Sequence, residues 1–452
     1  YYIDLLDAGD LASDPINTED IWVSFDFSGR DLSGNIILTR NADDAVLAGS
    51  FSKYTHYVPF YRYCGSENSG LMEGTWLAMR RTLTLGDTYF RNNKDRLGIT
   101  SPEVTLRYGS KIRLYMPSSV VGNGVEGTGG YEGQEGYSLS SKRPFIVTME
   151  IRDTVSNPLE REGTDVDDFC ELNGGLQIYS KGDDDTPATE VPEDPEDPEH
   201  PYSETSKRWV SACDSIPQVY VNVRYNPAEP GDQLSFPAPY HVGYEPYVSE
   251  ASVRDIDMQI AEALKKRFHG EGDDYEKYEG VKTLEADSVT LEGTAKIWYI
   301  GRFLDGFIFD TNIDEVKQII YGEVRKTGSA HSYDVQNPDL ITAFYYIVPH
   351  LKYGQWATLV TTSTNAYGTT GKSGGSSTST SSNGYTSSYY DYLNYLNYSQ
   401  MYYGNNGYYG GYYGGYGGNY DSGETTTTTK VYTDIPSFSP LIFQIYIEPD
   451  GK

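Results

Sequence analysis

The stretch Gln355-Trp-Ala-Thr-Leu-Val-Thr-Thr-Ser-Thr-Asn-Ala-Tyr-Gly368 decides the fold of this chain. Two further stretches belong with it. Ala295-Lys-Ile-Trp-Tyr-Ile-Gly-Arg-Phe-Leu-Asp-Gly-Phe-Ile-Phe-Asp-Thr-Asn312 precedes it, and Ile435-Pro-Ser-Phe-Ser-Pro-Leu-Ile-Phe443 follows much later. Several short patterns in a fixed order are far more specific than any one of them alone.

Together the three stretches resemble an FKBP-type peptidyl-prolyl cis-trans isomerase. The earliest stretch looks like the family's opening strands and turns, and the other two look like its closing half. The resemblance implies an α+β domain over residues 284–452, built as an antiparallel half-barrel sheet wrapped on a single short helix. It also implies a pocket for proline-containing polypeptides that works with no cofactor and no metal.

The chemistry of this family explains why aromatic residues matter. An X–Pro bond isomerises over a barrier of ~18–20 kcal/mol because amide resonance is lost at the twisted midpoint. The planar amide is more charge-separated than the twisted one and loses more when it leaves water. A dry aromatic pocket therefore favours the transition state without any nucleophile.

The resemblance assigns two polar residues and an apolar wall to the site. Tyr367 is expected to donate a hydrogen bond to the bound carbonyl, and Asp310 to lie at the rim of the pocket. The substrate-binding wall is expected to comprise Tyr299, Phe309, Leu340, Ile341, Phe344, Ile435 and Phe443. Phe344 stands where the family usually has Trp, and Pro349 lies inside the expected helix, which it would kink. The alternative is that these aromatics only form the core of a half-barrel.

A fainter copy of the same pattern occupies residues 1–155. The stretches that carry it are 21–38, 106–117 and 144–151. Its site residues are replaced: Phe27 stands for the first tyrosine, Ile37-Leu38 for Phe-Asp, Val121 for the turn tyrosine and Val147 for the last phenylalanine. A copy without the hydroxyl and the carboxylate is expected to be a binding or structural module.

An acidic, Pro-rich linker is expected over residues 156–207. Its centre, 183–199, holds nine acids, repeated prolines and no base. Such a run repels itself and cannot bury apolar surface, which predicts an extended or solvated segment. A calcium site is the alternative for so many carboxylates, but the glycine and ligand spacing of an EF-hand loop is missing.

Residues 208–283 are expected to connect the linker to the second domain. The stretch 216–225 alternates like a strand, which predicts a sheet edge or a pairing strand. The stretch 248–268 predicts an amphipathic helix, because apolar residues recur at helical spacing. They are Val253, Ile256, Ile260, Leu264 and Phe268.

An insertion at 372–434 replaces the short flap that the family has over its pocket. It holds Ser/Thr/Gly sequence and then fourteen tyrosines between Tyr385 and Tyr420. Low complexity with so many aromatics is typical of segments that associate with partners. A loop with no role is the alternative.

Charge and composition exclude other functions. The 35 basic and 65 acidic residues give a net charge of −30, and phosphate binding needs clustered Lys and Arg, so nucleic acid is not an expected ligand. The absence of a run of about 18 apolar residues predicts no transmembrane span. The stretch 122–127 matches a dinucleotide fingerprint, but the glycines after it indicate a glycine-rich loop. Three cysteines permit at most one internal disulfide.

Export is expected on two grounds. The chain begins at Tyr1 without Met, which suggests a preceding leader or a lipid-anchored segment. Asp153-Thr-Val, Asp214-Ser-Ile and Asp287-Ser-Val fit the O-glycosylation acceptor of Bacteroidetes, where tandem lipoprotein members of the family occur. We therefore expect a periplasmic or outer-membrane-surface protein of a Gram-negative bacterium that isomerises and chaperones exported clients. The alternative is a non-catalytic accessory subunit of an outer-membrane complex, docking through 372–434.

Overall fold

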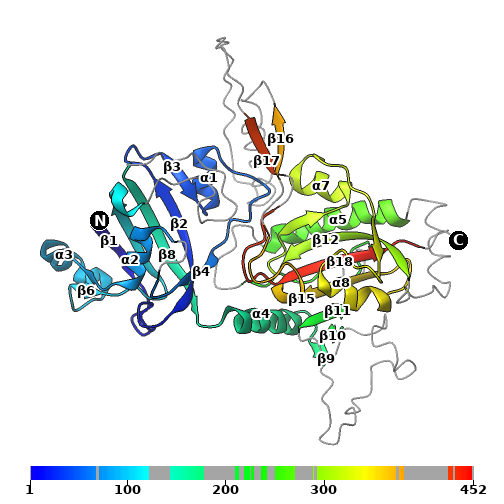
Figure 1. Cartoon of the computed structure of the whole chain (residues 1–452), viewed down its shortest axis with the longest axis horizontal. Helices are drawn as coiled ribbons and strands as arrows, with labels where there is room; N and C mark the ends of the chain where they lie inside the picture. Colours follow the sequence, from blue (N-terminus) through cyan, green and yellow to red (C-terminus); the bar gives the residue numbers. More distant parts are fainter. Residues whose placement is uncertain are drawn as a thin grey trace, which may run out of the picture.

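Two large sheets, antiparallel except for one short parallel pair at an edge, organise the chain, and each has its own apolar core (Figure 1). The fold is a mixed α+β arrangement in which helices cover both sheets. The computed structural model describes residues 2–67, 71–121, 143–177, 209–212, 218–223, 225–228, 236–241, 250–269, 289, 293–372, 376–380, 426–430 and 433–449.

The N-terminal sheet has the strand order β1-β7-β8-β2-β3, and β4 also pairs with β2. Its strands are β1 (Tyr2–Ala8), β2 (Ile21–Arg30), β3 (Ile36–Thr39), β4 (Phe60–Cys64), β7 (Ser110–Met116) and β8 (Phe145–Val155). The other elements of this half are α1 (Ala42–Ala48), α2 (Glu73–Arg80), α3 (Asp87–Leu97), η1 (Ser118–Val120) and the small hairpin of β5 (Leu83–Thr84) and β6 (Glu103–Val104). Burial alternates along β7, because only one face of the sheet packs on the core.

The C-terminal sheet has the order β13-β12-β18-β15-β11-β10-β9, and β14 also pairs with β12. Its strands are β9 (Leu176–Gln177), β10 (Trp209–Ser211), β11 (Val219–Asn222), β12 (Thr294–Phe303), β13 (Ile308–Thr311), β14 (His331–Asp334), β15 (Trp356–Thr361) and β18 (Leu441–Ile447). Every residue of β18 is buried, since helices cover both faces of this sheet.

Helices cover both faces of the C-terminal sheet. α8 (Thr342–Ile347), followed by the 3-10 turn η2 (Val348–His350), packs on one face. On the other face, α5 (Glu250–His269) and α7 (Asp314–Tyr321) pack against Trp298, Trp356 and Tyr446. α5 is the amphipathic helix expected at 248–268, whereas the expectation of a single helix within 284–452 is wrong, because α7 accompanies α8. Pro349 does not kink a long helix, because the α-helix ends at Ile347 and Pro349 lies in the 3-10 turn.

The structure corrects two of the expected segment boundaries. The range 156–207 is not all linker, because it begins with α4 (Pro158–Leu172). The Asn157 side chain caps this helix and Pro158 occupies its first turn, and apolar residues hidden among the acids bury its inner face. The strand expected within 216–225 is β11, and it pairs with β15 as an integral part of the C-terminal sheet.

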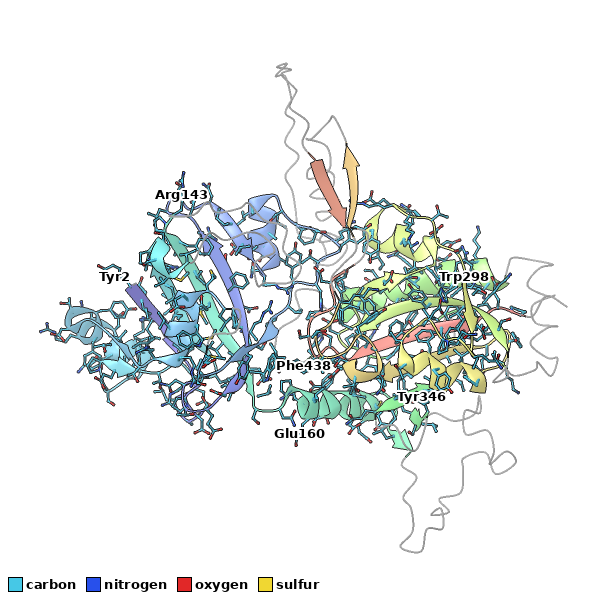
Figure 2. The ribbon with its side chains drawn as sticks, in the orientation of Figure 1. Tyr2, Arg143, Glu160, Trp298, Tyr346 and Phe438 are labelled. Carbon is cyan, nitrogen blue, oxygen red and sulfur yellow. The ribbon has the colours of Figure 1, made fainter. Side chains whose placement is uncertain are left out.

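Side chains of the two halves contact each other at several points. The His56 ring stacks on Phe303 at 4.5 Å, and its Nε2 lies 2.6 Å from Asp305 Oδ2, with both side chains buried. Trp22 packs edge-on against Phe438, which Figure 2 labels between the halves. α4 runs beneath this junction in the same view, where Glu160 marks its first turn.

The centre of the acidic run at 183–199, the glycine-rich loop at 122–127 and the tyrosine-rich stretch lie outside the described residues. Within the part that the structure describes, no helix is long and apolar enough to cross a membrane. Nor do the described His, Cys, Asp and Glu side chains form a group of three that could hold a metal ion. Cys64 and Cys170 are buried free thiols.

Candidate functional site

The nine residues expected to form the site come together on the face of the C-terminal sheet that carries α8. Phe309, Phe344, Ile435 and Phe443 are buried members of one apolar cluster. Tyr299, Leu340, Ile341 and Tyr367 are partly buried and pack against it, and Asp310 is bonded to Tyr299. The chain thus joins residues from β12, β13, β18, α8 and three loops. Their functional roles remain predictions.

Aromatic rings form the floor of this cluster. The Phe443 ring is near perpendicular to Phe309 at 5.6 Å and to Phe344 at 5.3 Å between centroids. Phe344, where the family usually has Trp, therefore still reaches the centre of the floor. Edge-to-face packing of this kind is favourable and fixes the ring orientations. The floor is rigid and apolar, while the partly exposed tyrosines stand at its margin.

The hydroxyl of Tyr299 donates a 2.8 Å hydrogen bond to Oδ2 of Asp310. The backbone positions this pair, because β12 and β13 are neighbouring strands. Burial raises the pKa of the Asp310 carboxyl, and the bond from Tyr299 offsets this only in part. Burial and the nearby Asp310 carboxylate raise the pKa of Tyr299, so its phenol remains a donor.

Tyr367 lies in a tight turn that follows β15. The 3-10 turn η3 (Ser363–Asn365) comes first, and Gly368 then adopts a left-handed φ of 76°. The Tyr367 ring packs perpendicular to Phe309 at 6.5 Å. Among the described residues its hydroxyl has no hydrogen-bond partner, so it can donate to a bound group. Burial, followed by the Asp310 carboxylate, raises the pKa of Tyr367 and keeps the hydroxyl protonated.

The base of the insertion closes beside Tyr367. Lys372 and Ile435 exchange two backbone hydrogen bonds, of 2.9 and 2.8 Å. The Lys372 Nζ lies 4.8 Å from the centroid of the Tyr367 ring, within the range of a cation–π contact. Further out, β16 (Ser376–Thr380) pairs with β17 (Thr426–Lys430) as a two-stranded ribbon. The ribbon rises from the C-terminal half in Figure 1.

The N-terminal sheet repeats the register of the C-terminal one. Gly29 pairs with Leu38 as Gly301 pairs with Asp310, and each ladder has a bulge directly after its glycine. The next strand in each sheet agrees as well: Val147 of β8 pairs with Gly29, and Phe443 of β18 pairs with Gly301. The two ladders are therefore equivalent position by position.

This equivalence identifies what the N-terminal half lacks. Phe27 occupies the position of Tyr299, and Leu38, buried at 2% exposure, occupies that of Asp310. One assignment needs correction: counting from the equivalent strands β7 and β15, Val121 corresponds to Ala366 rather than to the turn tyrosine. The next position is Gly122, which also has no hydroxyl and lies outside the described residues.

Two contacts of the site were not apparent in the sequence. Lys372 covers the ring of Tyr367, and Glu162 of α4 bonds to Ser363, which begins the turn that carries this tyrosine. The cap formed by Asn157 and Pro158 could have revealed α4. Nothing local predicts that a carboxylate should bond a residue 201 positions away.

No family model and no curated protein matches this chain. Two crystal structures are similar to it. One comprises the three FKBP domains of wheat FKBP73, at 10% identity over 99% of this chain and 93% of that chain, with a TM-score of 0.20. The other is a peptidyl-prolyl cis-trans isomerase of Pseudomonas syringae pv. tomato, at 13% identity over 44% of this chain and 92% of that chain, with a TM-score of 0.17.

Proposed function

We propose that the C-terminal half is an FKBP-type peptidyl-prolyl cis-trans isomerase. The observation that carries this proposal is the Tyr367 hydroxyl, which stands at the edge of an aromatic floor with no partner among the described residues. Tyr367 is only partly buried, so a bound group can reach its hydroxyl. Here it is available to a bound carbonyl.

The geometry supports a mechanism without covalent chemistry. The prolyl ring packs on Phe309, Phe344 and Phe443, which remove water from the amide. The twisted amide has less charge separation than the planar one, so this apolar floor favours the transition state. Tyr367 donates to the carbonyl of the bound peptide and fixes its position. The Tyr299–Asp310 pair forms the polar rim beside this floor.

The test measures cis/trans exchange of an X–Pro peptide with the full chain. Wild-type protein should accelerate exchange, and Tyr367→Phe should lower kcat/KM about tenfold, the equivalent of one hydrogen bond of ~1.4 kcal/mol. Tyr333→Phe is the matched control, because Tyr333 is a buried tyrosine of the same half and its hydroxyl has no partner among the described residues. A wild-type protein without activity, or equal rates for Tyr367→Phe and wild type, would refute the proposal.

We further propose that the clients are exported or outer-membrane proteins, which the protein would isomerise and chaperone at the periplasm or the outer-membrane surface of a Gram-negative bacterium. The motifs at 153–155, 214–216 and 287–289 support export, and an N-terminal lipid anchor would retain the protein at the membrane. Proteomic fractionation of the native cells tests this placement. Recovery in the cytoplasm would contradict it.

A second candidate function is that of a non-catalytic accessory subunit in an outer-membrane complex. One observation favours it: the two-stranded ribbon at the base of the 372–434 insertion begins beside Tyr367 and so adjoins the site. A partner held there would block access for a peptide. Co-purification of an outer-membrane protein with the full chain, lost when the insertion is shortened, would support this role.

A further inference from the structure

One buried carboxylate of α4 reaches the turn that carries Tyr367. Glu162 is 2% exposed. Its Oε2 accepts a 2.8 Å hydrogen bond from Ser363 Oγ, and its Oε1 accepts a second bond from the Ser363 N–H. Both donors belong to the residue that begins η3, so α4 caps this turn from outside.

Ser363 is also the residue that holds the turn on both sides of Tyr367. Its carbonyl accepts a 2.9 Å hydrogen bond from the Ala366 N–H and a 2.7 Å bond from the Gly368 N–H. These two amides flank Tyr367 in the sequence. The two backbone bonds on either side of the tyrosine therefore converge on a residue whose own donors are taken by Glu162.

Packing prevents α4 from withdrawing this carboxylate. Phe169 and Cys170, both about two turns further along the helix, are fully buried with Val360 and Ile442 of the C-terminal sheet. At Gly163, an added Cβ would lie 2.2 Å from the Gln218 side chain, so the helix approaches its neighbours closely at this point. The contact between Glu162 and Ser363 is thus fixed by the core and does not depend on a mobile side chain.

We infer that Glu162 is a positioning residue that orients the Tyr367 hydroxyl by holding Ser363 at the start of its turn. The catalytic importance of this orientation rests on the proposed function. The effect of Glu162 on the turn can be measured separately, by amide hydrogen exchange. One consequence is that the site requires α4, which lies outside the 284–452 range first expected to form it.

The test uses the full chain and hydrogen exchange. Glu162→Leu removes both acceptors, whereas Glu162→Gln keeps one for the Ser363 N–H and offers an amide to the hydroxyl. Glu160→Leu is the matched control on the exposed side of the same helix. In Glu162→Leu, the rate of amide hydrogen exchange at Ala366 and Gly368 should rise about tenfold or more, because the hydrogen bonds that hold Ser363 and its turn are lost. The kcat/KM should fall in parallel. Glu162→Gln should restore both to within about threefold of wild type.

The β15 amides separate positioning from a general loss of structure. They pair with β18 on one side, and their exchange should change less than about twofold in Glu162→Leu. If Glu162→Leu does not fold, Ser363→Ala removes only the Oγ bond and should raise Gly368 exchange by a smaller factor. Unchanged exchange at Ala366 and Gly368, or an equal rise along β15, overturns the inference. If wild-type protein shows no isomerase activity, the proposed function fails while the exchange data still decide the role of Glu162.

Discussion

The Tyr299 hydroxyl and the Asp310 carboxylate are joined by a 2.8 Å hydrogen bond between neighbouring strands. Burial raises the pKa of both groups, so each would be more costly alone than in the pair. The phenol stays protonated and supplies a permanent donor to a carboxylate in an apolar wall. This polar pair marks the rim of the candidate site. It also distinguishes the C-terminal half from the N-terminal half, which has Phe27 and Leu38 at the equivalent positions.

Tyr299→Phe should lower the free energy of unfolding by about 1–3 kcal/mol at neutral pH, because it leaves a buried acceptor without its donor. The loss should shrink in acid, where the carboxyl is protonated and needs the donor less. Urea unfolding at two pH values measures both effects. The control is Tyr115→Phe, since Tyr115 donates to Asp4 over a longer distance, 3.1 Å against 2.8 Å, and should matter less. Equal losses in the two variants would contradict the prediction.

The equivalent pair can be rebuilt in the N-terminal half. Leu38→Asp alone places a carboxylate in a buried position and should cost several kcal/mol of stability. Adding Phe27→Tyr should recover about 1–3 kcal/mol, since the new hydroxyl lies where Tyr299 lies relative to Asp310. A double-mutant cycle by chemical unfolding measures this coupling. Coupling near zero would show that the shared register does not extend to the side chains.

Sequence patterns predicted that the nine residues of the candidate site lie together, because six of them belong to three short stretches whose strands share one sheet. The sequence pattern aligns Phe27 and Leu38 with Tyr299 and Asp310, and the bulges after Gly29 and Gly301 give that alignment its structural basis. Counting along the turn placed Val121 one position off, since turns carry no alternation to fix their register.

Contacts between distant segments were missed for a different reason. The acids around α4 suggested a solvated linker, but Val166 and Phe169 bury one side of it. A helix with so few apolar residues is stabilised by its tertiary partner rather than by its own sequence, so local patterns understate it. The bond from Ser363 to Glu162 joins residues 201 positions apart, and no local rule predicts such a pair.

Glu162 should make stability depend on pH in the acid-to-neutral range. Burial, only partly offset by the bonds from Ser363, raises its pKa to about 7 from an ordinary 4.5. The folded state therefore holds this proton more tightly than the unfolded state, and the free energy of unfolding falls as pH rises from about 4.5 to about 7. The loss is on the order of 3 kcal/mol.

Glu162→Gln removes this titration while keeping the shape of the side chain. Relative to wild type, the variant should gain stability between pH 5 and pH 8, by up to about 3 kcal/mol. Urea unfolding of both proteins across this range gives the difference directly, and the contribution of Asp165, whose pKa burial also raises to about 6, is common to both. Parallel stability curves would show that the carboxyl titrates near its ordinary value.

Two glycines near Tyr367 should respond differently to alanine. Gly368 and Gly371 both have a left-handed φ, of 76° and 71°. A Cβ at Gly368 would meet nothing within 4 Å, whereas one at Gly371 would lie 2.1 Å from the Ile435 carbonyl oxygen. Gly368→Ala should therefore cost only about 1–2 kcal/mol of backbone strain, and Gly371→Ala clearly more. Thermal unfolding of the two variants shows which substitution costs more stability. A smaller loss for Gly371→Ala would mean that the backbone at Ile435 does not lie close to Gly371.

The insertion should be dispensable for folding. Lys372 and Ile435 already pair across its base, so replacing residues 373–434 by Asn-Gly converts the base into a two-residue hairpin of a favoured type. Shortening a long loop costs little stability, and we expect the free energy of unfolding to change by less than about 1 kcal/mol. The same variant should keep its isomerase activity if the site is formed by the sheet and α8 alone, and it should lose any partner held by the ribbon. Chemical unfolding, peptide exchange and co-purification test the three expectations separately. An unfolded variant would show that the insertion contributes to the core, and a folded variant that keeps every partner would place the docking surface elsewhere.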